Sequence, residues 1–310
     1  MPEWIVEHGI GETRFGRIED GEILQARVEL DGSVQAGSVI AARLKQMAKP
    51  AIAIAGDTEY LLSRGTPGAT EGAAIKIEIT REVIPGVEPW KRPLAKVTDE
   101  AVRDAPALEA RLAAGDELGA AGWDDLIEQA RSGTVSFIGG ELRISPTPAM
   151  TLIDVDGYLA PDELAVRGAG EAAKAIRRLD IGGSIGIDLP TTGSKAARQA
   201  AAAAIDQHLS QPFERTAVNG FGFVQIVRPR ARASLVELAQ DRAAFEARAF
   251  LRRAAFEAAG AKRLVAHPAV TAVLQAHGDW LDALARLLGG AINLRAEASL
   301  PMSGGYVENT

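Results

Sequence analysis

The sequence predicts an α+β protein that contains a small β-barrel and ends in a helical region. Three observations lead to this prediction. Residues 3–83 form a series of short β-type segments, residues 134–240 alternate between strands and helices, and residues 234–288 carry helical patterns. Strands and helices that are grouped in different parts of a chain are typical of α+β folds.

Composition narrows the class of protein. The 310 residues are enough for two or three domains, and 47% hydrophobic with 24% charged residues is ordinary for a globular chain. The net charge of −7 argues against a protein whose whole surface binds nucleic acid. Cysteine is absent, which excludes disulfides and Cys-ligated zinc. No apolar run is long enough to span a membrane and the start lacks a signal-peptide pattern, so we expect a cytoplasmic protein without membrane contact.

The N-terminal part indicates β-structure. Residues 3–30 read as three short strands, with a hairpin turn at Asp20-Gly21. Further strands, separated by turns rich in Gly, Pro and Thr, suit a small barrel and are expected at 39–46, 51–55, 59–62 and 73–82. Arg43 and Lys45 would then lie on one side of this barrel, together with Lys76 and Arg81, and a stripe of exposed charge of this kind is usually only solvated.

The middle of the chain begins with a linker. Pro85, Pro89 and Pro93 predict an extended crossover. Thr98 is a good N-cap and predicts a helix over 98–112 that breaks or restarts at Pro106, and a second helix is expected over 123–131. Strands then follow at 134–138, 141–144, 150–153, 182–188 and 221–227, with helices at 161–179 and 194–209.

The C-terminal part is predicted to be helical. Helices are expected over 234–259, 267–276 and 279–288, followed by a strand over 292–297 and a Gly/Ser tail. The first of these helices spaces five apolar residues as a stripe that faces the core: Leu235, Leu238, Phe245, Phe250 and Phe256.

Three aspartates follow the ends of two predicted strands. Asp154 and Asp156 point to one face because side chains alternate along a strand, and Asp188 ends the next strand along the chain. Neighbouring strands would bring the carboxylates together, and their mutual repulsion favours a divalent cation. Oxygen ligands without Cys or His suit Mg²⁺, with Mn²⁺ as the other candidate. The alternative is that each aspartate is only a turn or cap residue.

A basic cluster follows the predicted strand at 221–227. Arg228, Arg230 and Arg232 alternate with Pro and Ala, and they are candidates for contacts with phosphate groups. The alternative is a solvated loop that interrupts the strand at Pro229.

Three segments share an unusual pattern of glycines, acids and arginines: 137–156 (FIGGELRISPTPAMTLIDVD), 177–188 (RRLDIGGSIGID) and 221–235 (FGFVQIVRPRARASL). Together they resemble the ribonuclease E/G family. The first resembles its Gly-Gly turn and the strand that ends in Ile-Asp-x-Asn, and the second its Arg-Asp-x-Gly-Gly-x-Ile-x-Ile-Asp. The third is similar to Phe-Gly-Leu-x-Glu-x-x-Arg-x-Arg-x-x-x-Ser-Leu. The order and spacing agree over about 134–238, and the N-terminal hairpin and barrel fit the family's order more weakly.

The resemblance implies an RNase H-like and DNase I-like catalytic core with an inserted S1-like barrel of the OB type. Residues 1–35 would join the RNase H-like part, 36–84 would form the barrel, and 85–133 a linker with helices. Residues 134–240 would form the DNase I-like core and 241–310 the helical C-terminal region. In that family, the aspartates matching Asp154 and Asp188 hold the catalytic Mg²⁺, and the asparagine matching Asp156 supports them.

Several family features are missing. Asp156 replaces the asparagine, and residues 51–56 lack the phenylalanines that the family's barrel presents to RNA. The Arg-Thr-Ala-Gly pocket that senses an RNA 5′-monophosphate has no counterpart between Pro85 and Gly133. The cysteine pair that links subunits through zinc is absent, so no zinc-linked dimer is expected, and the chain is expected as a monomer or small homo-oligomer.

Two functions follow as hypotheses. The first is an Mg²⁺-dependent endoribonuclease, a metal-dependent phosphodiester hydrolase that cuts single-stranded RNA in RNA processing. Asp154, Asp156 and Asp188 would be catalytic, with Asp154 and Asp188 as metal ligands. The residues that would bind RNA are Arg228, Arg230, Arg232, Arg43 and Lys45. The alternative is a weakly active or inactive relative that binds RNA or a protein, and a purely structural subunit would leave the three acids unexplained.

Overall fold

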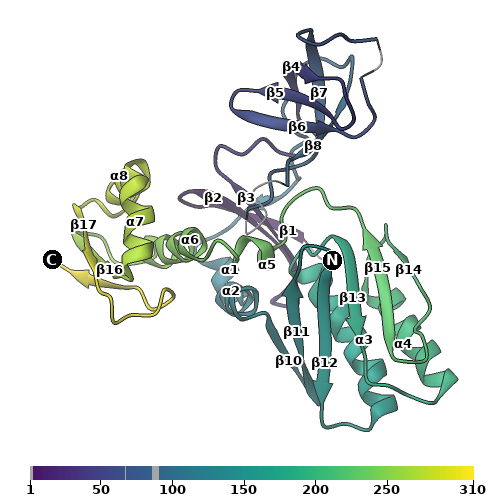
Figure 1. The fold of residues 1–310 in the computed structure, drawn as a ribbon. Coiled ribbons are helices and arrows are strands. Elements are labelled where there is room, and N and C mark those ends of the chain that lie inside the picture. Colours follow the sequence, from purple (N-terminus) through teal and green to yellow (C-terminus); the bar gives the residue numbers. More distant parts are fainter. Residues whose placement is uncertain (1–2, 67, 86–90) are drawn as a thin grey trace. The chain divides into compact units, whose positions relative to one another are not determined.

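The computed structural model describes residues 3–66, 68–85 and 91–310 (Figure 1). The protein is a mixed α+β fold with several sheets and a closed five-stranded β-barrel, in agreement with the predicted class. It divides into two compact units, each of which is discontinuous in sequence. Unit 1 comprises Met1–Asp31, Ala110–Arg131 and Leu238–Thr310, and unit 2 comprises Gly32–Glu109 and Ser132–Glu237.

Unit 1 contains a four-stranded sheet near the N-terminus. The three strands that the sequence predicts are present, and a short fourth strand pairs parallel to β1; the strands are β1 (Glu3–His8), β2 (Glu12–Glu19), β3 (Glu22–Leu30) and β9 (Arg111–Leu112). The sheet order is β3-β2-β1-β9. Asp20 and Gly21 both have positive φ, 54° and 81°, as a tight type I′ hairpin turn requires.

The helix predicted over residues 98–112 is wrong. This segment is extended, with a single bridge between Val39 and Arg103 before β9 begins. The hydroxyl of Thr98 does accept a hydrogen bond from the Glu100 amide, 3.2 Å away, but no helix follows. A Thr side chain satisfies local backbone groups in turns as well as at helix starts, and Pro106 cannot continue a helical ladder.

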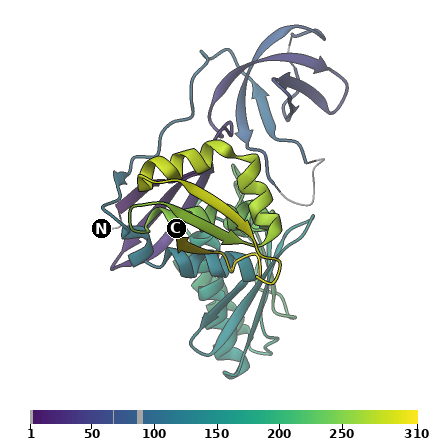
Figure 2. The ribbon, with the colours of Figure 1, turned by 90° about the vertical axis from the view of Figure 1, so that its left-hand side faces the viewer.

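The rest of unit 1 combines helices with a second sheet (Figure 2). The helices are α1 (Glu117–Ala120), α2 (Trp123–Ser132), α6 (Arg242–Ala255), α7 (Pro268–Ala276) and α8 (Gly278–Leu288). The strands are β16 (Lys262–Ala266), β17 (Ile292–Ala296) and β18 (Tyr306–Asn309), in the order β17-β16-β18. The prediction of a helical C-terminal region was therefore incomplete, because two of these strands were not expected.

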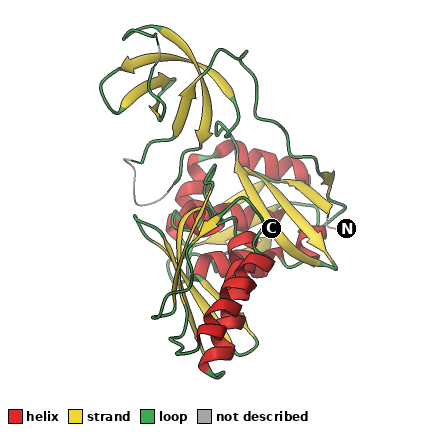
Figure 3. Ribbon diagram, turned by 90° about the vertical axis from the view of Figure 1, so that its right-hand side faces the viewer, coloured by secondary structure: helices red, strands yellow, loops and turns green. Residues whose placement is uncertain are grey.

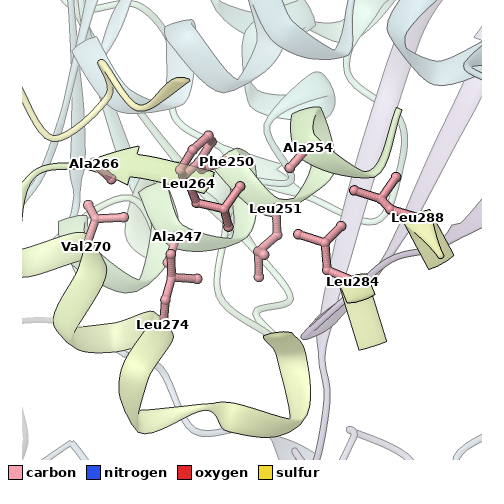
Figure 4. Close-up of a cluster of buried hydrophobic side chains, with 10 residues drawn as sticks. All are labelled: Ala247, Phe250, Leu251, Ala254, Leu264, Ala266, Val270, Leu274, Leu284 and Leu288. Carbon is pink, nitrogen blue, oxygen red and sulfur yellow. The ribbon is translucent and has the colours of Figure 1, made fainter. Parts of the chain in front are cut away.

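The single helix predicted over 234–259 is divided. A short α5 (Leu235–Leu238) ends before Asp241, whose carboxylate caps the start of α6 by accepting a hydrogen bond from the Ala244 amide. Four of the five predicted core residues are buried, but Phe256 follows the end of α6 and is 47% exposed. Phe250 and Leu251 on α6 belong to a cluster of ten buried apolar side chains from α6, α7, α8 and β16 (Figure 4).

A buried ionic network connects the N-terminal and C-terminal segments of unit 1. Arg14, whose side chain is 1% exposed, donates to Glu7 and Glu12, with both distances 2.7 Å. Arg248 and Arg252 on α6 donate to the same two carboxylates, Arg248 to Glu12 and Arg252 to Glu7. Removing one member would leave its partners charged and buried, so this network specifies how the segments pack.

The barrel in unit 2 confirms the predicted β-barrel. Its strands are β4 (Val39–Gln46), β5 (Ala51–Ala55), β6 (Thr58–Leu62), β7 (Ala74–Arg81) and β8 (Leu94–Val97), and the closed order is β4-β5-β6-β8-β7. Small and branched side chains fill the interior, among them Ala53, Ile77 and Ala95, each 0% exposed. The sequence placed residues 94–97 in a linker, although β8 is the strand that closes the barrel.

The second part of unit 2 is a six-stranded sheet with two helices on one face (Figures 1 and 3). Its strands are β10 (Thr134–Phe137), β11 (Gly140–Pro146), β12 (Thr151–Gly157), β13 (Gly183–Asp188), β14 (Glu214–Arg215) and β15 (Phe223–Arg228), in the order β10-β11-β12-β13-β15-β14. The covering helices are α3 (Pro161–Arg178) and α4 (Lys195–His208). Their apolar faces pack on residues such as Ile153 and Ile187, both 0% exposed.

The opposite face of this sheet carries the polar side chains. Along β12, buried Thr151, Ile153 and Val155 alternate with exposed Leu152, Asp154 and Asp156.

Among the residues that the structure describes, no helix combines the length and apolarity that crossing a bilayer requires.

Candidate functional site

Asp154 and Asp188 lie side by side on neighbouring strands. β12 and β13 pair in parallel, and the register places Asp154 directly beside Asp188. Adjacent strands lie about 4.8 Å apart, and both side chains are exposed on the face of the sheet that α3 and α4 leave open. The strand–helix–strand order β12-α3-β13 produces this arrangement, because a helical crossover returns the chain to a parallel neighbour.

The electrostatics of Asp154 reflect this neighbourhood. Partial burial raises the pKa of the Asp154 carboxyl above its ordinary value, and the negative charges of Asp156 and Asp188 raise it further. The amide of Val155 and the guanidinium of Arg143 oppose these effects. A carboxyl group whose neighbours resist its ionisation gains from a bound cation, which neutralises the repulsion.

Asp156 lies on the same face, two residues beyond Asp154. In the antiparallel pairing of β11 with β12, it faces Glu141, while Asp154 faces Arg143. Arg143 donates to Glu141 at 2.9 Å and is largely exposed. The polar face therefore holds four carboxylates and one guanidinium within three adjacent strands.

The two paired aspartates fit an Mg²⁺ ion better than the full set of three does. Within residues 3–66, 68–85 and 91–310, no group of three or more His, Cys, Asp or Glu side chains is arranged to hold an ion. Mg²⁺ is commonly bound by one or two carboxylates and completes its shell with water and substrate phosphates. Asp154 and Asp188 supply such a pair, and the charge of Asp156 helps to raise the pKa of Asp154.

Apolar side chains border the acids on the same face. Gly186 lies between Leu152 on β12 and Gln225 on β15. A Cβ atom at Gly186 would come within 2.6 Å of the ring of Phe223 and within 3.0 Å of Leu152, so only glycine allows these side chains to cover the strand. Phe223 is the cross-strand partner of Asp188, which places an aromatic ring next to one of the two candidate ligands.

The three arginines predicted to contact phosphate lie at the other end of the sheet. Because β13 and β15 are antiparallel, Phe223 faces Asp188 while Arg228 faces Gly183. Five residues of strand separate the two positions, or about 17 Å. The sequence alone did not show that the arginines and the acids occupy opposite ends of the same strand pair.

Each of these arginines also has a partner within unit 2. Arg228 donates to the carbonyl of Ile181 at 2.8 Å, and burial lowers the pKa of its guanidinium. Arg230 pairs with Glu237. Arg232 pairs with Asp180 at 3.1 Å and lies 4.0 Å from Glu82. A phosphate group would have to compete with these contacts.

Arg228 and Arg232 support the end of α3 before β13. Asp180 has a positive φ of 53°, and the amides of Asp180 and Ile181 donate back to Arg177 and Ile176. This is a Schellman-type end, with aspartate where glycine is usual. The guanidinium contacts of Arg228 with the Ile181 carbonyl and of Arg232 with Asp180 hold this turn, which starts the strand that carries Asp188.

The barrel residues predicted to bind RNA lie on the outer surface of β4. Arg43 donates to the carbonyl of Gly72 at 2.8 Å. Lys45 pairs with Glu59, which also pairs with Arg92 at 2.7 Å. Leu44 between them is 1% exposed and faces the interior, so Arg43 and Lys45 share the outer face.

Three residues near the acids were not predicted from the sequence. Arg143 on β11 faces Asp154 on β12, and the alternation of Glu141, Leu142 and Arg143 was the signal for its position. Tyr158 follows the end of β12 and is 84% exposed, and Phe221 precedes the start of β15 and is 80% exposed, both at the acidic edge. Nothing in the local sequence pattern marks an aromatic residue as exposed, so the exposure of Tyr158 and Phe221 became evident only from the structure.

Comparisons with known proteins add no assignment. No protein-family model matches the chain, and no curated protein matches it significantly.

Proposed function

We propose that this protein is an Mg²⁺-dependent endoribonuclease that cuts single-stranded RNA, as a shortened relative of the ribonuclease E/G family. The observation that carries the proposal is the register of β12 and β13, which sets Asp154 beside Asp188 on the open face of the sheet. The proposal includes the finer fold assignment, in which this sheet is the DNase I-like part, the N-terminal strands belong to an RNase H-like part, and the barrel is S1-like.

The roles of the residues follow from their positions. Asp154 and Asp188 would hold Mg²⁺, which when bound activates water and stabilises charge on the scissile phosphate. Asp156 would ligate the ion or orient the attacking water. Arg143 presents a guanidinium beside Asp154, where it can contact a phosphate oxygen of the substrate.

The test is cleavage of an end-labelled, AU-rich single-stranded RNA. We expect cleavage in Mg²⁺ or Mn²⁺, none in EDTA, and restoration when the metal is added back. Asp188→Asn and Asp154→Asn should each abolish cleavage without unfolding the chain. Asp206→Asn is a matched control, because that exposed carboxylate pairs with Arg215 and lies outside the site.

Two results would contradict the proposal. Cleavage that persists in EDTA would point to a contaminant or to a different mechanism. Cleavage by Asp188→Asn at the wild-type rate would show that the paired aspartates are not the metal ligands.

The second candidate function is RNA binding without cleavage. Two observations favour it: the charge of Asp156, where the family has a neutral amide, and the internal contacts that occupy Arg228, Arg230 and Arg232. An additional negative charge opposes the approach of a phosphate group. RNA binding with no product in Mg²⁺ or Mn²⁺ would favour this function over the nuclease, and a failure to bind RNA would leave a protein partner as the remaining form of this alternative.

A further inference from the structure

Two exposed aromatic side chains lie at the acidic edge of the six-stranded sheet. Tyr158 follows the last residue of β12 and is 84% exposed, and Phe221 precedes β15 and is 80% exposed. The acidic ends of β12 and β13 and the start of β15 all lie at this edge, because Asp154 is level with Asp188 and Asp188 with Phe223. Tyr158 and Phe221 therefore lie on either side of β13, which carries Asp188.

The backbone around Tyr158 is fixed. Its amide donates to the carbonyl of Gly139 at 3.1 Å, in the turn between β10 and β11. Gly139 has a φ of +105°. A Cβ atom at Gly157, the residue before Tyr158, would lie 2.3 Å from the Gly139 carbonyl oxygen, so the two turns are in close contact. Tyr158 itself remains largely in solvent.

The backbone around Phe221 is fixed in a similar way. Its amide donates to the side chain of Asn219 at 2.9 Å, and its carbonyl accepts from the hydroxyl of Thr191 at 3.1 Å. Gly222 has a φ of +92°, and its carbonyl accepts from the amide of Leu189, the residue after Asp188. The loop that presents the Phe221 ring is therefore connected to the strand end that presents Asp188.

The spacing of the two residues suits a ligand that lies across the acidic edge. β12 and β15 are both neighbours of β13, so their backbones are about 10 Å apart. Tyr158 lies four residues beyond Asp154, and Phe221 lies two residues before Phe223, the partner of Asp188, so both lie beyond the acids toward the same edge. One backbone hydrogen bond at Tyr158 and two at Phe221 hold these exposed residues at the edge, where a planar ligand can reach their rings. Bases of a single strand stack on such side chains, independently of sequence.

We propose that Tyr158 and Phe221 are stacking platforms for two bases of a single-stranded RNA whose backbone passes Asp154 and Asp188. The inference rests on the proposed function for the identity of its ligand. It adds the residues that hold the strand, and it places base contacts on the sheet itself, where the barrel offers no phenylalanine in Ala51–Ala55.

The test measures binding separately from cleavage. The affinity of a fluorescein-labelled single-stranded RNA is measured by anisotropy, first in EDTA and then with Mg²⁺ in the Asp188→Asn variant. Tyr158→Ala and Phe221→Ala should each weaken binding by about fivefold or more, since stacking contributes about 1–3 kcal/mol per base. Tyr158→Phe and Phe221→Tyr keep a ring and should bind within about twofold of the parent.

Controls separate stacking from general loss of apolar surface. Leu287→Ala removes a side chain that is 60% exposed in unit 1 and should leave RNA affinity unchanged. Replacing single bases by abasic sugars keeps every phosphate. The abasic site that faces a given ring should weaken binding to the parent protein but not to the variant that lacks this ring, a non-additivity that reports direct contact.

The outcomes distinguish this inference from the proposed function. Wild-type affinity in both alanine variants, or additive penalties at every abasic position, would overturn the inference even if Mg²⁺-dependent cleavage is observed. Ring-dependent binding without any cleavage would support the inference and contradict the nuclease. A protein that binds no single-stranded RNA would overturn it, and the two rings would then be tested as a protein contact.

Discussion

Replacing Asp188 with asparagine should stabilise unit 2 in the absence of metal. The substitution keeps the size of the side chain and removes one of two like charges that the register holds side by side. For two carboxylates about 5 Å apart, Coulomb's law gives about 0.8 kcal/mol in water and about 3 kcal/mol at an effective dielectric constant of 20. Both side chains are exposed, so we expect a gain near the lower figure, about 1 kcal/mol.

The gain should depend on conditions in a defined way. At 1 M salt the Debye length is about 3 Å, so most of the gain should disappear. It should also disappear as the pH falls through the raised pKa of Asp154, because protonation then relieves the repulsion in the wild type. Combined with Asp154→Asn, the two gains should not add, since each substitution removes the same repulsion.

The measurement must report on the stability of the six-stranded sheet of unit 2. Trp4, Trp123 and Trp280, the tryptophans among the described residues, all lie in unit 1. We therefore suggest a urea series in EDTA with pulsed hydrogen exchange, measured on peptides that contain β12 and β13. Asp206→Asn should behave in the opposite way and lose up to about 1 kcal/mol, because the carboxylate of Asp206 pairs with Arg215. A loss of stability in Asp188→Asn, or a gain that salt does not reduce, would refute the reasoning.

Three further predictions follow. Mg²⁺ affinity, measured by calorimetry, should fall as the pH drops through the raised pKa of Asp154. Asp156→Asn should weaken Mg²⁺ binding and flatten its pH dependence. Identical affinities and slopes in both forms would show that Asp156 does not influence the metal. RNAs with 5′-hydroxyl, monophosphate and triphosphate ends should be cut at similar rates, and a tenfold preference, about 1.4 kcal/mol, would reveal a missed sensor. Glu237→Ala should cost about 1–3 kcal/mol in urea unfolding, because buried Glu237 accepts hydrogen bonds from Ser234 and pairs with Arg230; an unchanged midpoint would contradict this.

Local patterns predicted the elements that carry the candidate site. The apolar run before Asp154 and the alternation beyond it identified β12 and its polar face, and Asp188 ended β13 as expected. Four of the five barrel strands, β4 to β7, were also found, because each is short and bounded by turn residues. What alternation could not supply was the direction of β15 relative to β13, which decides that Arg228 lies far from Asp188.

The wrong or missing elements have a common physical cause, since tertiary pairing overrides local preference. Thr98 begins a good capping pattern, but Arg103 pairs with Val39 instead of entering a helix. Residues 94–97 follow a proline-rich segment and still form β8, because the pairing of this strand with its neighbours closes the barrel. β16 begins at Lys262, which is 2% exposed and donates to Asn309 on β18, a contact that no local pattern reveals.

The discontinuity of unit 1 has a consequence for how the chain folds as it is synthesised. Glu7 and Arg252 are 245 residues apart in sequence, and Glu12 and Arg248 are 236 apart. At a translation rate of about 5–20 residues per second, β1–β3 would leave the ribosome on the order of 10–40 s before α6 does.

During that interval, the carboxylates of β1 and β2 must remain without their arginine partners on α6. All of unit 2 is complete once Glu237 has been made, so its sheet and barrel can form first. The acidic edge that carries Asp154 and Asp188 would thus be assembled on a nascent chain before the segment that carries α6 has been made to pair with the N-terminal strands.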